Sequence, residues 1–534
     1  MKNIISILFI ATILIFAGCS EDFLDRKPYD QRVVGNFYQT PEDGFEALVA
    51  VYDMLQWGGG ENSNDYNNIH IITEIASDNC YGGAGTSDNA FCQDVDQFIN
   101  FFDGHAQSWE RFYRGIYRAN LFLESANDID WGSDPYNLEK KYKGEAHFLR
   151  AFFYFNLVRM FGNVPLLTET IAPEDAYIAQ ADPEDVYEFI AEDLIIASNN
   201  LPGTPYSGPN EESGRATKWA AQSLYARVFL YYTGYYNTEG ITDKLTKSRA
   251  RSYIDSVINV SGHELLDDFK RLWQFAPFEG SSFAGEDNAE TVFAIKYTWH
   301  GQGDQNIHDG NRWQVMIGLR DEIVAPFSDG WGLATVNPSL YAEWPEGDTR
   351  RDNTILAWEE LGIDYHPESQ REYTGYNWKK YCPLTTIDST ERQTDSLNGN
   401  FMWDNFFDDI IIRFADVLLM GAELHLDDNL TLAQDYFDRV RDRAFQNIDH
   451  RIVLANDING FQTIMEERRW ELALEGQRYW DLLRQGIDVT EEAINTTSPY
   501  ERPFRRETMG LFAIPETQIE LSNGTLYQNP GWPQ

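Results

Sequence analysis

The chain has 534 residues, with 42 Lys and Arg against 85 Asp and Glu, so its formal net charge is −43. Aromatic residues make up 14% of it, which is too many large apolar rings for a disordered acidic polymer. The negative charge argues against a nucleic-acid partner, because nothing in the composition would neutralise phosphates. Four cysteines are too few for a disulfide framework or several zinc sites.

The N-terminus carries an export signal. An apolar run from Ile4 to Phe16 precedes Ala17-Gly18-Cys19. Its thirteen residues would rise about 20 Å as a helix, short of the roughly 30 Å hydrocarbon core, so we interpret residues 1–18 as a signal peptide. Two small residues before Cys19 resemble a bacterial lipobox, which predicts lipidation of Cys19. An ordinary signal peptide with an incidental cysteine is the alternative.

Apolar residues recur at helical spacing along much of the mature chain. Pro41 and Pro183 stand at predicted helix starts, and Gly162 with Pro165 predicts a helix end. The predicted helices lie near residues 41–56, 109–123, 146–160, 186–201, 214–236, 247–260, 411–426, 430–446 and 461–485.

Short acidic or Asn turns join several of these segments, as between 411–426 and 430–446, so we expect antiparallel helix hairpins. Repeated hairpins indicate a mostly α fold of tetratricopeptide-like type, although no clean 34-residue consensus is present. We predict one domain over residues 19–534, with its helical scaffold at 41–56, 106–260 and 408–486.

Two segments interrupt the helical pattern. Residues 57–108 are rich in Gly, Asn, Asp and Ser, and residues 262–408 contain 8 of the 15 Trp. Irregular segments of this length are usually functional in a compact protein. We therefore expect both to be loop-rich regions that bind a ligand.

The sequence contains no enzyme signature. It has no phosphate-binding loop, dinucleotide glycine motif or nucleophile-elbow serine. His300 and His308 share one polar segment, but two histidines eight residues apart are weak support for a metal site. Close carboxylate pairs such as Asp408-Asp409 are expected by chance in so acidic a chain.

The first irregular region suits neutral or cationic ligands, because no Lys or Arg occurs between Val33 and Glu110. We predict ligand contacts from Asp78, Asn79 and Tyr81. Asp94 and Asp96 offer oxygens of the kind that calcium takes, although solvated loop acids are the alternative and the spacing fits no EF-hand. A disulfide between Cys80 and Cys92 would close this region and leave Cys382 as the odd thiol; three unpaired thiols are the alternative.

The second irregular region suits a sugar. A pyranose packs its C–H face on an indole or phenol ring, while its hydroxyl groups need amide and carboxylate partners. We predict ligand contacts from Trp299, Gln302, Asn306, Trp313 and Trp331, although any single Trp is more often buried in the core. The basic-free first region favours a neutral polysaccharide over a polyanionic one, although Arg312, Arg320 or Arg350 could supply positive charge elsewhere.

The block from Glu467 to Arg484 is densely charged. Oppositely charged residues three positions apart, such as Arg468 with Glu471 and Asp481 with Arg484, predict helix-supporting ion pairs rather than an active site.

The whole chain resembles the SusD/RagB family, the surface lipoproteins of Bacteroidetes that capture nutrients. The match includes Cys19-Ser20-Glu21-Asp22, which resembles the acidic surface-export signal of such lipoproteins. Further matching blocks, in order, are 23–25, 109–123, 144–151, 161–166, 220–228, 413–423, 439–444, 467–484, 514–515 and 528–532. Asp416 stands where the family more often has Glu.

The resemblance implies a scaffold of four tetratricopeptide-like helix pairs and a role in polysaccharide utilization. It implies a lipid-anchored protein of the outer-membrane surface that captures a glycan, with a neutral one favoured by the composition, and passes it to a SusC-like TonB-dependent transporter. It implies no enzyme activity. We expect no cofactor other than the structural calcium for which Asp94 and Asp96 are candidates. Peptide capture of the RagB type and a lipid-anchored glycoside hydrolase remain alternatives, as does a purely structural subunit of the transporter complex.

Overall fold

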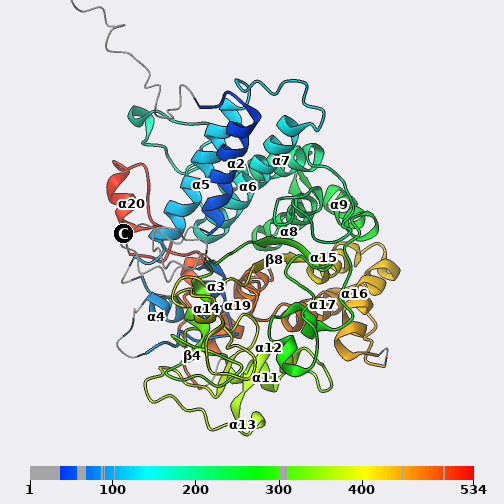
Figure 1. The fold of residues 1–534 in the computed structure, drawn as a ribbon. Coiled ribbons are helices and arrows are strands. Elements are labelled where there is room, and N and C mark those ends of the chain that lie inside the picture. Colours follow the sequence, from blue (N-terminus) through cyan, green and yellow to red (C-terminus); the bar gives the residue numbers. More distant parts are fainter. Residues whose placement is uncertain are drawn as a thin grey trace, which may run out of the picture.

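The computed structural model describes residues 37–56, 68–85, 88, 91–100, 103–299, 310–447, 449–496 and 499–533. Paired helices dominate the first half and return near the end of the chain (Figure 1). These helices are α2 (Pro41–Gln56), α5 (Ala106–Ser125), α6 (Leu138–Phe161), α7 (Pro183–Asn200), α8 (Lys218–Tyr236), α9 (Lys247–Val260), α15 (Phe414–His425) and α16 (Leu430–Phe445).

Each of these helices packs on its neighbour in a continuous series. Helix α2 packs on α5, α5 on α6, α6 on α7, α7 on α8, and α8 on α9, while α9 continues onto α15 and α15 onto α16. In Figure 1 the series runs from the blue and cyan helices across to the yellow ones. The expected helix-hairpin scaffold is confirmed.

Local signals set the ends of these helices. Pro41 and Pro183 are the first residues of α2 and α7, and the Asp182 side chain accepts a hydrogen bond from the Glu184 N–H at 2.9 Å. Gly162 ends α6 at φ +67°, a backbone conformation that a residue with a side chain rarely adopts.

Shorter elements fill the rest of the chain. The remaining α-helices are α3 (Ile69–Ile75), α4 (Phe91–Asp96), α10 (Trp313–Ile317), α11 (Pro338–Ala342), α12 (Arg351–Thr354), α13 (Trp358–Leu361), α14 (Gln393–Ser396), α17 (Ile458–Glu471), α18 (Arg478–Leu483), α19 (Ile487–Asn495) and α20 (Glu516–Leu521). The 3₁₀ helices are η2 (Pro173–Asp175), η3 (Phe269–Leu272), η4 (Ala276–Glu279) and η5 (Arg506–Thr508). No described helix is both long enough and apolar enough to cross a bilayer.

The strands are few and short. They are β1 (Gly240–Ile241), β2 (Leu245–Thr246), β3 (Thr291–Ile295), β4 (Leu319–Arg320), β5 (Asp329–Gly330), β6 (Ile355–Ala357), β7 (Tyr376–Trp378) and β8 (Asp409–Arg413). Strand β3 pairs antiparallel with β8, with Thr291 opposite Arg413 and Ile295 opposite Asp409. Strand β3 lies within the second irregular region, and β8 follows that region and leads directly into α15.

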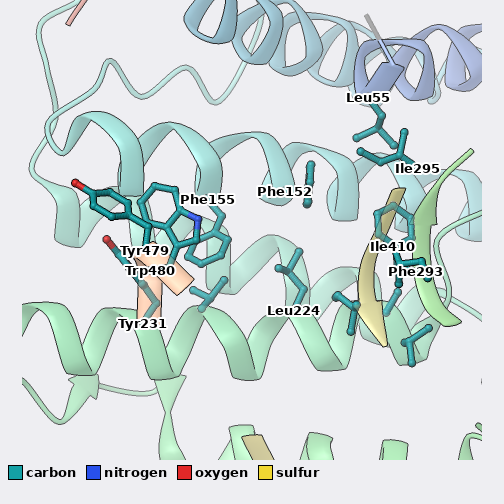
Figure 2. Packing of buried hydrophobic residues seen from close by; sticks show 14 of the residues in the cluster. Leu55, Phe152, Phe155, Leu224, Tyr231, Phe293, Ile295, Ile410, Tyr479 and Trp480 are labelled. Atoms are coloured by element: carbon teal, nitrogen blue, oxygen red, sulfur yellow. The ribbon is translucent and has the colours of Figure 1, made fainter. Parts of the chain in front are cut away.

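The main core lies between the helices and the β3–β8 pair. Figure 2 shows Phe155 from α6 beside Tyr231 from α8 and Trp480 from α18, with Phe293 and Ile410 further along. The Tyr231 and Trp480 rings meet edge to face, 5.9 Å apart. Rings from three distant parts of the sequence therefore close one core.

The charged block of residues 467–484 differs from the prediction. The expected helix over 461–485 is divided into α17 and α18, and positive φ angles at Leu474 and Gly476 break it. Only Asp481 and Arg484 form the expected pair three residues apart, at 2.7 Å.

The other charges of this block make buried long-range ion pairs. Glu471 binds Arg350 at 2.7 Å and also contacts Arg413 and Arg443, and Arg468 binds Asp416 at 2.6 Å. The charged block therefore has the structural role that was predicted. Its ion-pair partners, however, come from distant parts of the sequence, because the helix is broken after α17. Arg350 is fully buried here, so it does not supply charge to a ligand.

The region of residues 57–108 is also not a surface loop throughout. Helix α3 is buried over most of its length, since Ile71, Ile72 and Ile75 face the core. Its carboxylate residue Glu74 accepts a 2.7 Å hydrogen bond from the Gly476 N–H, which lies in the α17–α18 break. The described part of this region is therefore a component of the core.

Candidate functional site

The eight Trp of residues 262–408 divide into two groups. Five are buried in the core: Trp273, Trp313, Trp344, Trp358 and Trp378. The other three, Trp299, Trp331 and Trp403, are at least partly exposed. Because a surface cluster of indoles is unusual on a protein that keeps most of its Trp inside, these three define the candidate site.

Trp299 is the most exposed of the three, at 37%. Its indole lies against the backbone of Gly399, where a Cβ atom would come within 2.6 Å of the ring. Thr394 lies at the same place, within 2.9 Å of that Cβ position. Glycine at 399 therefore lets the Trp299 indole approach the segment that follows α14 closely.

The Arg312 side chain contacts the rings of both Trp331 and Trp403. The Arg312 guanidinium carbon lies 3.9 Å from the ring centre of Trp403 and 5.7 Å from that of Trp331. Arg312 immediately precedes α10, and the Asn311 N–H donates to the Asn405 carbonyl at 2.5 Å. These contacts hold the start of α10 on the segment that carries Trp403.

Phe401 extends the same surface, with the Arg392 guanidinium carbon 3.9 Å from its ring centre. Residues 399–403 thus connect the Trp299 contact, Phe401 and Trp403 within five consecutive positions. We call Trp299, Trp331, Phe401 and Trp403 the aromatic shelf.

Two arginines beside the aromatic shelf, Arg392 and Arg320, are held by carboxylates. Arg392 binds Asp329 through two hydrogen bonds of 2.7 and 2.6 Å, and Arg320 binds Asp88. Arg320 also donates to the Trp331 carbonyl at 3.2 Å, which ties the first irregular region to the shelf. Burial favours neutral carboxyls, but Arg392 outweighs it and lowers the pKa of Asp329 below its ordinary value.

Trp313, predicted to contact ligand, is instead a core residue at 2% exposure. Its ring stacks on His70 at 4.9 Å and meets Tyr381 edge to face at the same distance. The prediction fails because Trp313 is the first residue of α10 and faces inward, whereas the preceding Arg312 reaches the shelf.

The predicted contacts Asp78, Asn79 and Tyr81 are also buried, so we correct their assignment. The Asp78 carboxylate binds Arg478 at 2.7 and 2.8 Å, and Arg469 at 3.1 Å. Burial would raise its pKa, but the two guanidinium groups hold the pKa well below its ordinary value.

Asn79 and Tyr81 serve the fold in the same way. The Asn79 amide donates to Glu74 at 2.8 Å, and the Tyr81 ring meets Tyr500 edge to face at 5.2 Å. Asn79 and Tyr81 come shortly after α3 in the sequence and are buried with it, because they contact Glu74 and Tyr500.

The proposed disulfide does not form in the structure. Cys80, Cys92 and Cys382 are separate buried thiols. Cys80 makes a backbone bridge to Val336, whereas Cys92 lies in α4. Burial raises the pKa of the Cys92 thiol to about 12.

The described residues contain no group of three or more His, Cys, Asp or Glu side chains arranged for a metal ion. Of the two predicted calcium ligands, Asp94 is buried, and Asp96 binds the buried Arg502 at 2.8 Å. Burial raises the pKa of the Asp96 carboxyl to about 6, against the effect of Arg502. Calcium binding stays a prediction.

Three predicted residues, Cys19, Gln302 and Asn306, lie outside the described part of the chain, as does the signal peptide. Two described residues of the site were missed: Phe401 and Trp403. Their signal was present in the sequence as an aromatic pair among Asn400, Asp404 and Asn405, the same mixture of rings and amides that marks residues 297–306.

Comparison with known proteins shows the family. Residues 22–230 match a family described as "Starch-binding associating with outer membrane", and residues 344–532 match the SusD family. A SusD-like protein of Bacteroides ovatus is 25% identical over 513 residues, which cover 93% of this chain and 85% of that protein.

Solved structures give the same result. A laminarin-binding SusD-like protein is 30% identical, with a TM-score of 0.77 over 93% of this chain and 100% of its own. Surface glycan-binding protein A from Bacteroides fluxus is 26% identical, with a TM-score of 0.75 over 92% of this chain and all of its own. The chain therefore belongs to the SusD/RagB family, with the helical fold of that family.

Proposed function

We propose that this protein is a cell-surface lipoprotein, anchored in the outer membrane through Cys19, that binds a glycan on the aromatic shelf. The observation that carries the proposal is the partly exposed set of Trp299, Trp331 and Trp403, which residues 399–403 and the Arg312 side chain connect. Such rings can pack on the C–H faces of a sugar chain, and the amides and carboxylates beside them can hydrogen-bond its hydroxyl groups. The glycan would then pass to a SusC-like TonB-dependent transporter.

A neutral glycan fits this surface best. Arg320 and Arg392 are each bound to a carboxylate, so they offer little charge to an anionic polysaccharide. The structural relative that is 30% identical is named for laminarin binding, which makes laminarin the first ligand to test.

We infer that the protein binds without cleaving. A glycoside hydrolase needs two carboxyl groups facing each other across a cleft, about 5 or 6.5–9.5 Å apart. Around the shelf, Asp88 and Asp329 are instead occupied by arginines. Both structural relatives described above are named as binding proteins.

An array of neutral and acidic polysaccharides and of peptides, probed with the mature protein, tests the proposal. We expect binding to a neutral glycan such as laminarin and no release of reducing ends on prolonged incubation. Binding confined to peptides would favour capture of the RagB type. New reducing ends would show a hydrolase, and no binding to any ligand would leave only a structural subunit.

A further inference from the structure

A buried acidic residue outside the aromatic shelf fixes the segment that carries Trp299. Trp299 comes shortly after the end of β3, and between them the Tyr297 N–H donates to the Asp408 Oδ1 atom at 3.0 Å. The Lys296 side chain also contacts the Asp408 carboxylate, which is only 2% exposed. A buried carboxylate that binds a backbone N–H and a neighbouring cation sets the direction in which the chain leaves the strand.

The residue before Asp408 contacts the other end of the shelf. The Phe407 N–H donates to the Gln314 side chain at 3.1 Å, and the Phe407 carbonyl accepts from the Asn311 amide at 2.6 Å. Asn311 and Gln314 lie on either side of Arg312, whose side chain contacts the other indoles of the shelf. Residues 407–408 are therefore hydrogen-bonded to the segments that carry both ends of the aromatic shelf.

Glu286 lies beside Asp408. Its Oε1 atom accepts from the Asp408 N–H at 3.2 Å and from the Gln274 amide at 2.9 Å. Burial, together with Asp408, raises the pKa of the Glu286 carboxyl to about 8, so this group is neutral at pH 7. Burial also raises the pKa of Asp408, although Lys296 opposes that effect. At pH 7 the two acids therefore share one negative charge, which Lys296 stabilises on Asp408.

Other titratable groups leave little room for a second negative charge. Among the described residues, the groups around Glu286 besides Asp408 are Lys296, Asp287 and Tyr381. Lys296 binds Asp287 at 3.0 Å and lies 3.9 Å from Glu286, while burial raises the pKa of Tyr381 and keeps it uncharged. When Glu286 ionises, three carboxylates share the single charge of Lys296. Repulsion in this partly buried place then acts directly on Asp408.

We propose that Asp408 is a positioning residue of the aromatic shelf, and that Glu286 makes this positioning depend on pH. While Glu286 is protonated, Asp408 binds the Tyr297 N–H and keeps Trp299 in the geometry that binds a glycan. When Glu286 is ionised, Asp408 is repelled, the Trp299 segment loosens, and glycan affinity falls. The inference rests on the proposed function for its ligand, but the change at Trp299 takes place without one.

Fluorine NMR of the mature protein labelled with 5-fluorotryptophan follows Trp299 in the absence of glycan. The Trp299 signal is the one that disappears in Trp299→Phe. We expect its chemical shift to change between about pH 7 and 9 in the native protein, and to stay constant in Glu286→Gln, which cannot ionise. Glu279→Gln is the matched control and should keep the native change, because Glu279 binds Lys270 and Lys379 instead. A Trp299 signal that does not change with pH, or that changes equally in Glu286→Gln, would overturn the proposal.

Calorimetric titration with laminarin measures the effect on binding. Between about pH 7 and 9 the affinity should fall about threefold or more in the native protein and stay constant in Glu286→Gln. At pH 7, Asp408→Ala should bind about fivefold more weakly, since it loses the acceptor of the Tyr297 N–H. Asp408→Asn keeps an acceptor oxygen, so it should restore the affinity of the native protein and show no pH dependence.

The two measurements separate this inference from the proposed function. Equal laminarin affinity in the native protein and in Asp408→Ala would overturn the positioning role of Asp408. If Asp408→Ala does not fold, the pH profiles of the native protein and of Glu286→Gln decide the question. A native protein that binds no laminarin at all would count against the proposed function, and the fluorine signal of Trp299 would still decide whether Glu286 controls its position.

Discussion

The Asp78 carboxylate accepts two hydrogen bonds from the Arg478 guanidinium, at 2.7 and 2.8 Å, although 400 positions separate the residues. Nearby, Glu74 accepts from the Gly476 N–H, 402 positions away. Residues 74–78 and the charged block of residues 467–484 thus bind each other inside the protein. This relationship explains why polar residues that suggest a binding loop are inside the protein.

Replacing Asp78 by Asn should destabilise the protein without altering glycan binding. The change leaves Arg469 and Arg478 buried without their charged partner, and breaking a buried ion pair costs about 3 kcal/mol or more. Urea unfolding measures this loss. The matched control is Asp488→Asn, which removes the exposed pair with Arg506 and should leave the free energy of unfolding nearly unchanged.

Acid should remove the Asp78 contribution as well. Its pKa is lowered in the folded protein, so the stabilisation is present above the ordinary Asp pKa of about 4 and is lost as the pH falls below it. The difference in free energy of unfolding between the native protein and Asp78→Asn should therefore shrink below about pH 4. A difference that stays constant to pH 2 would contradict the assigned pairing.

The two classes of Trp should separate experimentally. Trp403→Ala removes part of the shelf and should reduce affinity for laminarin about tenfold, since losing roughly 1.4 kcal/mol of apolar contact gives that factor. Trp313→Ala leaves a core cavity and should cost about 3–5 kcal/mol of stability. Calorimetric titration and urea unfolding of both variants measure the two effects. If Trp403→Ala bound laminarin with the affinity of the native protein, the aromatic shelf would not be the binding site.

Glu286 should make the protein less stable as the pH rises towards 8. Burial, with Asp408 beside it, raises the pKa of its carboxyl to about 8. Between about pH 4.5 and 8 the folded protein then retains a proton that the unfolded chain has lost, so the free energy of unfolding falls with rising pH. Glu286→Gln removes this dependence.

The measurement is the urea midpoint of both proteins across pH 5 to 9. The curve of Glu286→Gln should be flatter, with the variant gaining relative stability at the alkaline end. Glu279→Gln is a useful comparison, because Lys379 and Lys270 outweigh burial and lower the pKa of Glu279, so its effect should not grow over that range. If the urea midpoints of the native protein and Glu286→Gln changed with pH in parallel, the raised pKa of Glu286 would be contradicted.

The three described thiols should resist modification. Cys80, Cys92 and Cys382 are buried, and burial raises the pKa of each. In a mature chain with Cys19 replaced by Ser, dithionitrobenzoate should label no thiol in the native state and three after unfolding. The prediction would be wrong if mass spectrometry without reductant detected a peptide in which a disulfide links Cys80 to Cys92.

Helices with a clear apolar stripe could be predicted from the sequence, and α2 and α9 have the predicted bounds. Their signal is local, since a 3.6-residue period and a proline or threonine at the start suffice. The break between α17 and α18 was missed, because the partners of Glu471 and Gly476 come from Arg350, Arg413 and Glu74, far away in the sequence.

The candidate site was predicted only in part. The sequence showed that rings and amides gather in residues 262–408, and Trp299 and Trp331 remain in the described site. It did not show which rings face outward. Arg312 and Trp313 are adjacent, yet one reaches the shelf and the other stacks on His70 in the core. Which of the two faces outward depends on how the first turn of α10 is oriented. That orientation is fixed by residues distant in the sequence, such as Asn405, His70 and Tyr381.

The contacts of α3 also constrain the order of assembly. Asp78 and Glu74 are synthesised about 400 residues before Arg478 and Gly476. Until almost all of the polypeptide has emerged, Asp78 lacks Arg478 and Glu74 lacks the Gly476 N–H, so these contacts cannot form earlier. The closing of this part of the core therefore depends on the C-terminal block, and truncation before residue 476 would prevent it.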